Sequence, residues 1–123
     1  MGKESWAKYG MEKGKGTAMK SGAFQESKEE GFQAALVAPP GQPSEDIFKN
    51  ATKGLWKIAN DLTGTARELA TKINKQKSKE ERESALDIAR EAARRAGLQA
   101  AIAAGWEQGW KEGIIARDSK TLD

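Results

Sequence analysis

Small and large residues follow two parallel series with a spacing of four in the last third of the chain. The first series consists of Gly97, Ala101, Gly105, Gly109 and Gly113, and the second of Leu98, Ile102, Trp106, Trp110 and Ile114. Residues four apart are neighbours on a helix, so the first series predicts a groove with few side chains and the second a ridge beside it. Each glycine costs a helix about 1 kcal/mol relative to alanine, so we expect another helix to pack into the groove and offset that loss. We therefore take these ten residues as the predicted interface.

The spacing of four also constrains how a neighbouring helix can lie. Four residues advance the helix by about 400°, so the small-residue series drifts around the helix axis by about 40° per step. One straight neighbour cannot follow such a groove along its whole length. We expect either two neighbours to share the groove or one to cross it steeply, and neither Gly105 nor Gly109 to face open solvent.

Two tryptophans, Trp106 and Trp110, lie one helical turn apart within this stretch. A pair of this kind is either core packing against the chain's own helices or an anchor that inserts into a partner protein. The sequence leaves both interpretations open.

The N-terminal third repeats the small-residue spacing, with Gly10, Gly14, Ala18 and Gly22 four apart. We expect a helix from about Ser21 to Val37 and a weaker one before it, and leave open whether residues 1–20 are ordered alone. Residues 31–38 are similar to residues 97–104, which indicates either a true internal repeat or chance in a composition rich in alanine and glycine.

Residues 39–44 form a proline-rich hinge that interrupts the helical pattern. Ser44 is expected to cap the next helix, which runs from Glu45 to about Lys75. That segment has heptad-like spacing of Phe48, Leu55, Leu62 and Leu69, with Ala51, Ile58 and Thr65 between them. Ile47, Ala59, Ala66 and Ile73 widen the stripe, so we expect this helix to pack against two neighbours.

Ser78 and Glu81 form a capping box that predicts the start of a last helix, from Lys79 to about Arg117. No segment alternates as a strand does, so the predicted fold is all-α, with three to four helices and a long C-terminal helix packed through its glycines. The expected organisation is a glycine-rich helical segment (1–38), the hinge (39–44), a helical hairpin (45–117) and a polar tail (118–123).

Composition argues against enzymatic chemistry. The 123 residues include no cysteine and no histidine, which removes thiol nucleophiles, the usual general base and the usual metal ligands. Glu83, Asp87 and Glu91 share one helical face, but a solvated, ion-paired face is the favoured interpretation. We therefore expect the protein not to be an enzyme and to bind neither a metal nor a cofactor.

The net charge of +3 is too small to identify a nucleic-acid binder. A local basic cluster lies at the predicted turn between the last two helices, and its candidate phosphate contacts are Lys72, Lys75, Lys77 and Lys79. An ordinary solvated turn is the favoured interpretation, because no aromatic residues are interleaved to stack on bases.

No apolar run approaches the roughly 18 residues that a membrane-spanning helix needs, and the N-terminus lacks the apolar core of a secretory signal. The expected location is therefore the cytoplasm or a virion.

The segment Gly105–Gly113 resembles the glycine repeats in the N-terminal region of the flagellar and type III secretion stator family, and the GX3 repeats of Yae1-type adaptor proteins. The similarity covers about nine residues, extended loosely by Gly97 and Ala101. It implies close helix packing between chains and carries no activity with it.

These observations favour a non-enzymatic structural subunit of a larger assembly, as a homo-oligomer or with other proteins, and a phage virion is the suggested setting. A second hypothesis is a small helical adaptor or inhibitor that binds its partner through Trp106 and Trp110. A third is a nucleic-acid-associated protein that uses the lysine cluster.

Overall fold

The structure, a computed structural model, describes residues 3–73 and 78–121, and over these ranges its regular secondary structure is α-helix. The helices are α1 (Lys3–Ser21), α2 (Ala23–Val37), α3 (Gln42–Ile73) and α4 (Lys79–Thr121). No strand occurs within these ranges, so the predicted all-α class is confirmed.

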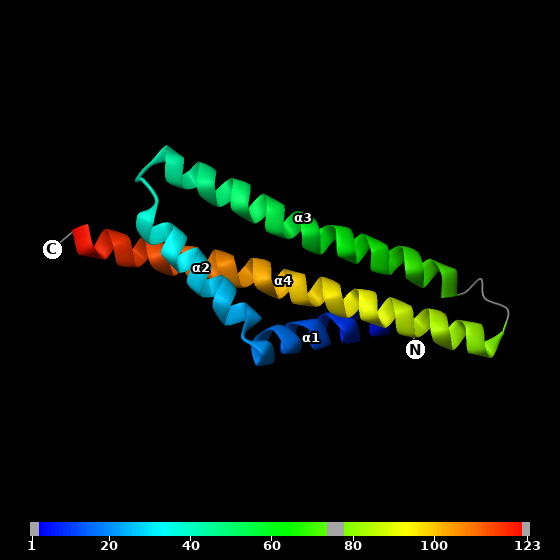
Figure 1. Cartoon of the computed structure of the whole chain (residues 1–123). Helices are drawn as coiled ribbons and strands as arrows, with labels where there is room; N and C mark the ends of the chain where they lie inside the picture. Colours follow the sequence, from blue (N-terminus) through cyan, green and yellow to red (C-terminus); the bar gives the residue numbers. More distant parts are fainter. Residues whose placement is uncertain (1–2, 74–77, 122–123) are drawn as a thin grey trace.

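Helix α4 is the centre of the arrangement, because each of the other helices packs mainly against it (Figure 1). With 43 residues, α4 is about 65 Å long. Helix α3 runs along one side of α4, antiparallel to it, whereas α1 lies on the other side and α2 crosses α4 obliquely toward the start of α3 (Figure 1). The chain bends between α1 and α2 at Gly22, whose φ of 83° lies in the left-handed region that glycine adopts without strain.

The starts of the two long helices test the capping predictions. The predicted role of Ser44 is wrong: α3 begins at Gln42, and the carbonyl oxygen of Gly41 accepts hydrogen bonds from the backbone N–H groups of Ser44 and Glu45. Pro43 fits this earlier start, because proline is tolerated in the first turn of a helix. The start of α4 is confirmed, with the Glu81 N–H donating to Ser78 Oγ at 3.0 Å.

Alanine dominates the buried core. Apart from Trp106 and Trp110, the buried hydrophobic residues in the described part of the chain are alanines, among them Ala35, Ala89 and Ala96 with no exposed surface. Such small side chains let helices approach closely but bury little apolar area each. The fold therefore depends on long, close helix contacts more than on a bulky interior.

Within the described chain, helix α3 has one extensive contact, with α4, so these residues do not supply the second neighbour that its stripe predicts. Its buried residues Ala59, Ala66 and Ala70 face α4. Ile47 and Ile58, which the heptad pattern places in the stripe, are 40% and 49% exposed. Thr65 is also exposed. The apolar stripe is therefore wider than the surface that α4, its one extensive neighbour in the described chain, covers.

Candidate interaction surfaces

The glycine groove of α4 is occupied by α1 and α2 of the same chain. A Cβ atom added to Gly97 would collide with the backbone of Met11 in α1, and one added to Gly109 would collide with the carbonyl oxygen of Lys28 in α2. An added Cβ atom would lie 2.9 Å from the Phe24 carbonyl oxygen at Gly105 and 2.6 Å from the Phe32 carbonyl oxygen at Gly113, both in α2. Ala101, which lies between Gly97 and Gly105 in the series, is also buried. The helix backbones are therefore in direct contact along this groove.

The glycines of the N-terminal helices take part in the same contacts. A Cβ atom on Gly14 would meet the backbone of Arg94 and Leu98, and one on Gly31 would meet the carbonyl group of Trp106. The bend at Gly22 divides the covering layer, so that α1 lies over the first part of the groove and α2 over the rest. Two neighbours share the drifting groove, and both come from this chain.

The two tryptophans lie inside the chain's own core. Trp106 is 8% exposed and Trp110 6%, and their ring centroids are 5.4 Å apart in a stacked arrangement. The Phe48 ring of α3 lies 6.2 Å from the first and 5.8 Å from the second. Ile114 packs against this cluster, whereas Leu98 and Ile102 are half-buried. Neither indole can reach a partner without opening the helices around it.

Polar contacts fix the position of α2 on α4. Ser27 is buried, and its hydroxyl donates to the carbonyl oxygen of Ile102 at 2.6 Å. Lys28 forms an ion pair with Glu112 at 3.4 Å. Sequence reasoning missed Ser27, although it belongs to another series of small residues four apart, together with Ala23, Gly31 and Ala35.

Arg117 connects the C-terminal part of α4 to the hinge. Its Nη1 donates to the carbonyl oxygen of Ala38 at 3.0 Å and to Ser44 Oγ at 3.3 Å. Because Ala38 follows the end of α2 and Ser44 lies in the first turn of α3, one guanidinium links three helices. An unpaired carbonyl at a helix end is a favourable position for a cation. No pattern in the sequence indicates this role of Arg117.

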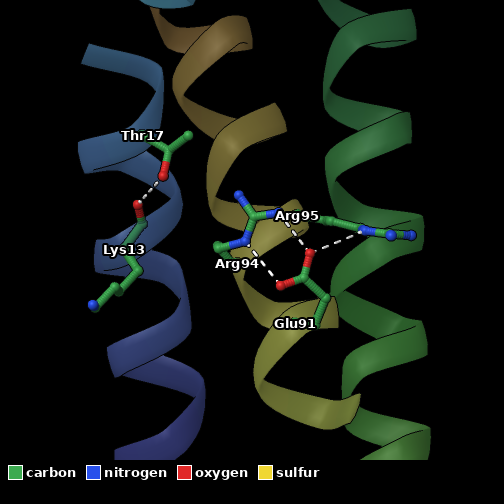
Figure 2. Close-up of polar contacts among 5 residues, drawn as sticks. All are labelled: Lys13, Thr17, Glu91, Arg94 and Arg95. Carbon is green, nitrogen blue, oxygen red and sulfur yellow. Dashed lines mark hydrogen bonds and ion pairs between the residues drawn. The ribbon is translucent and has the colours of Figure 1, made fainter. Parts of the chain in front are cut away.

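Glu91 lies between two arginines on the surface of α4 (Figure 2). Arg94 Nε donates to one carboxylate oxygen at 2.9 Å and Arg94 Nη2 to the other, while Arg95 Nε lies 3.5 Å from that second oxygen. Hydrogen bonding from Arg94 lowers the pKa of the Glu91 carboxyl, and the same bond raises the pKa of Arg94. The closer partner is thus Arg94, three residues on, rather than Arg95, four residues on.

The remaining polar candidates that the structure describes lie on the surface. Lys72 and Lys79 are exposed near the ends of α3 and α4, and Lys75 and Lys77 lie outside the described residues. Asp87 pairs with Arg90 at 3.8 Å, and Glu91 with its two arginines. Over the described ranges no group of three acidic side chains could hold a metal ion.

Shallow apolar grooves lie between the helices of the described part of the chain. The first lies between α3 and α4, has a volume of about 420 Å³, and is lined by Leu62, Thr65, Leu69, Asp87, Ile88, Glu91, Ala92 and Arg95. The second, of about 460 Å³, is lined by residues that include Met11, Met19, Phe24 and Trp56. The third lies near Phe48, Trp110 and Arg117, beside the hinge, and has a volume of about 390 Å³.

Comparisons with protein-family models, curated proteins and solved structures give no match to this chain. None of the helices in the described ranges has the length and apolar character needed to cross a membrane.

Proposed function

We propose that the protein is a non-enzymatic structural subunit of a larger protein assembly. The proposal rests on the apolar stripe of α3, because the contact with α4 covers only part of its width. Ile47 and Ile58 expose 40% and 49% of their surface along that helix. Apolar side chains repeated along one helix face are typical of a surface that another helix covers.

The total surface of the molecule supports the same proposal. Its accessible surface is 8094 Å². A compact monomer of its mass would expose about 6,500 Å², so the chain exposes roughly 1,600 Å² more. The excess reflects the elongated shape, in which three helices are spread along a fourth (Figure 1). A shape of this kind offers long helix faces to other subunits.

The burial of the two tryptophans argues against the adaptor hypothesis, which needed both indoles at a partner's surface. The nucleic-acid hypothesis has only the exposed Lys72 and Lys79 in its favour, because Lys75 and Lys77 lie outside the described residues. A phage virion is still the setting that we suggest for such a subunit, on the basis of the sequence alone.

Measurement of the mass in solution by light scattering, at a few micromolar and at about 200 µM, tests the proposal. We expect the mass to exceed the 13.3 kDa of one chain and to rise with concentration. A folded protein that remains at the mass of one chain at both concentrations would overturn it.

A further inference from the structure

The uncovered side of α3 carries a regular series of residues, which we call the outer face. It consists of Ile47, Ala51, Gly54, Ile58, Leu62, Thr65 and Leu69, with spacings of three or four. Ile47, Gly54, Ile58 and Thr65 are exposed, and the other three are half-buried against the rest of the chain. A Cβ atom added to Gly54 would have no neighbour within 4 Å. The exposed part of this face therefore has no covering element among the described residues.

The groove between α3 and α4 extends this face onto a second helix. Ile88 of α4 is 54% exposed and lines that groove together with Leu62 and Leu69 of α3. The apolar surface is thus broader at the C-terminal half of α3 than a single helix would make it.

We propose that a second copy of this chain binds the outer face, with the two α3 helices antiparallel and the two-fold axis at Ile58. This inference rests on the proposed function, because it identifies one contact of the assembly. In this register, residues whose numbers add up to 116 lie opposite one another.

The antiparallel register places a glycine opposite a leucine and pairs the other residues of the face by similar size. Gly54 lies opposite the partner's Leu62, Ala51 opposite the partner's Thr65, and Ile47 opposite the partner's Leu69. Ile47 then enters the open groove beside Leu69 and Ile88. A parallel pair would instead place Gly54 against its own copy and leave a gap. Small residues opposite large ones fill the space between helices evenly.

Charge supports the same register. Lys57 and Asp61 are exposed on one flank of the outer face, one helical turn apart. The antiparallel arrangement brings Lys57 of each copy beside Asp61 of the other, on both sides of the two-fold axis. Flanking pairs of this kind contribute more to orientation than to affinity.

The available area is sufficient for a dimer. From Ile47 to Leu69 the outer face is about 33 Å long, about 10 Å wide along α3 alone and about 20 Å wide over its C-terminal half, where α4 extends it. The area is roughly 500 Å² per copy, or about 1,000 Å² in total, which reaches the size of about 1,000 Å² that a specific interface needs.

Cross-linking tests the register directly, because the natural chain has no cysteine. Ile58→Cys should give a covalent dimer with a short bis-maleimide, whereas Asn60→Cys, on another side of α3, should not. Ile47→Cys alone should stay uncross-linked, but an equimolar mixture of Ile47→Cys and Leu69→Cys chains should form a covalent heterodimer. Cross-linking of Ile47→Cys to itself would overturn the antiparallel register. Failure of Ile58→Cys would overturn the assigned axis.

A charged substitution tests the face without disturbing the fold. Ile58→Glu should weaken self-association at least tenfold and leave the helical circular dichroism unchanged, since this side chain is half exposed in the single chain. The matched control is Ile115→Glu, at an isoleucine that is 66% exposed on α4, outside the outer face. Equal effects of the two substitutions would contradict the inference.

The outcomes for the two proposals are distinguishable. If the natural chain is larger than 13.3 kDa in solution but Ile58→Cys does not cross-link, the dimer inference fails and the proposed function stands. If the natural chain has the mass of one subunit at 200 µM, both fail.

Discussion

Helix α4 contacts its neighbours in two different ways on its two sides. Toward α1 and α2, glycines bring backbone against backbone, and added Cβ atoms on Gly97 or Gly109 would overlap main-chain atoms. Toward α3, side chains fill the space, with Trp106 and Trp110 stacked on each other and packed against Phe48 at one end, and alanines packed together at the other. Backbone contacts leave almost no freedom to adjust, whereas side-chain contacts can repack.

The contrast explains for which glycines a close helix contact within the chain offsets the loss of helix stability. Gly97, Gly105, Gly109 and Gly113 each permit a close approach of another helix. Gly54 and Gly64 of α3 have no atom within 4 Å of an added Cβ, so they weaken their helix without any contact in the described chain. Substitutions on each side should therefore have effects of different sign and size.

The largest effect is expected from Trp110→Ala on the side-chain face. This substitution removes a buried ring from the stack with Trp106 and Phe48, and truncation of a buried tryptophan costs about 3–5 kcal/mol. Urea denaturation followed by circular dichroism measures the loss. Trp56→Ala is the control, because Trp56 is half-buried and should cost less. Equal losses of unfolding free energy would mean that the stacked rings stabilise the protein no more than the half-buried Trp56 does.

Gly109→Ala tests the backbone face. The new methyl group would overlap the Lys28 carbonyl oxygen, and overpacking of about 3 kcal/mol, reduced by about 1 kcal/mol of improved helix propensity, gives a net loss of about 2 kcal/mol. The same denaturation experiment measures it. Gly16→Ala in α1 is the matched control, since its added Cβ has no neighbour within 4 Å. An unchanged stability of Gly109→Ala would refute the close approach of α2.

Gly64→Ala should stabilise the protein by about 1 kcal/mol, because it improves the helix without a collision. The thermal midpoint should rise. Gly54→Ala should give the same gain in dilute protein, but it should weaken self-association if Leu62 of a second copy lies opposite. A gain in association from Gly54→Ala would contradict the proposed pairing.

The smallest effect concerns the pH dependence of stability through Glu91. Because Arg94 lowers the pKa of this carboxyl in the folded state, its stabilising effect is fully present above the unfolded pKa of about 4.3. The effect is lost as the pH falls through the lowered folded pKa. The difference in thermal midpoint between the natural chain and Glu91→Gln should be small, constant near neutral pH, and vanish in acid. A difference that grows in acid would contradict the assigned pairing.

The sequence predicted the helical class, the four-residue series on α4 and the capping at Ser78, because these depend on local periodicity. It could not predict that α1 and α2 of the same chain would cover the glycine groove, since periodicity describes a surface and not the element that fills it. The sequence also misplaced the start of α3. The carbonyl oxygen of Gly41 accepts the first hydrogen bonds of the helix, and Pro43 lies in its first turn, so Ser44 is not the cap.

The contacts of Ser27 and Arg117 were beyond sequence reasoning for a related reason. Ser27 and Ile102 are 75 residues apart in the chain, and Arg117 and Ala38 are 79 apart. Such pairs form only when α4 brings the hinge and α2 together, so no local pattern encodes them. The wide stripe of α3 was visible in the sequence, and the second neighbour that it predicts is the subject of the dimer proposal.

The dependence of α1, α2 and α3 on α4 has a consequence for synthesis on the ribosome. The three earlier helices make few contacts with one another, and α4 comes after all of them in the chain. Their apolar faces therefore stay uncovered until translation has passed residue 113, the last glycine of the groove. At about 5–20 residues per second, the delay between completion of α3 and completion of the groove is a few seconds. During that interval the nascent chain is most exposed to proteases and chaperones, and slowing translation within α4 should lower the yield of folded protein.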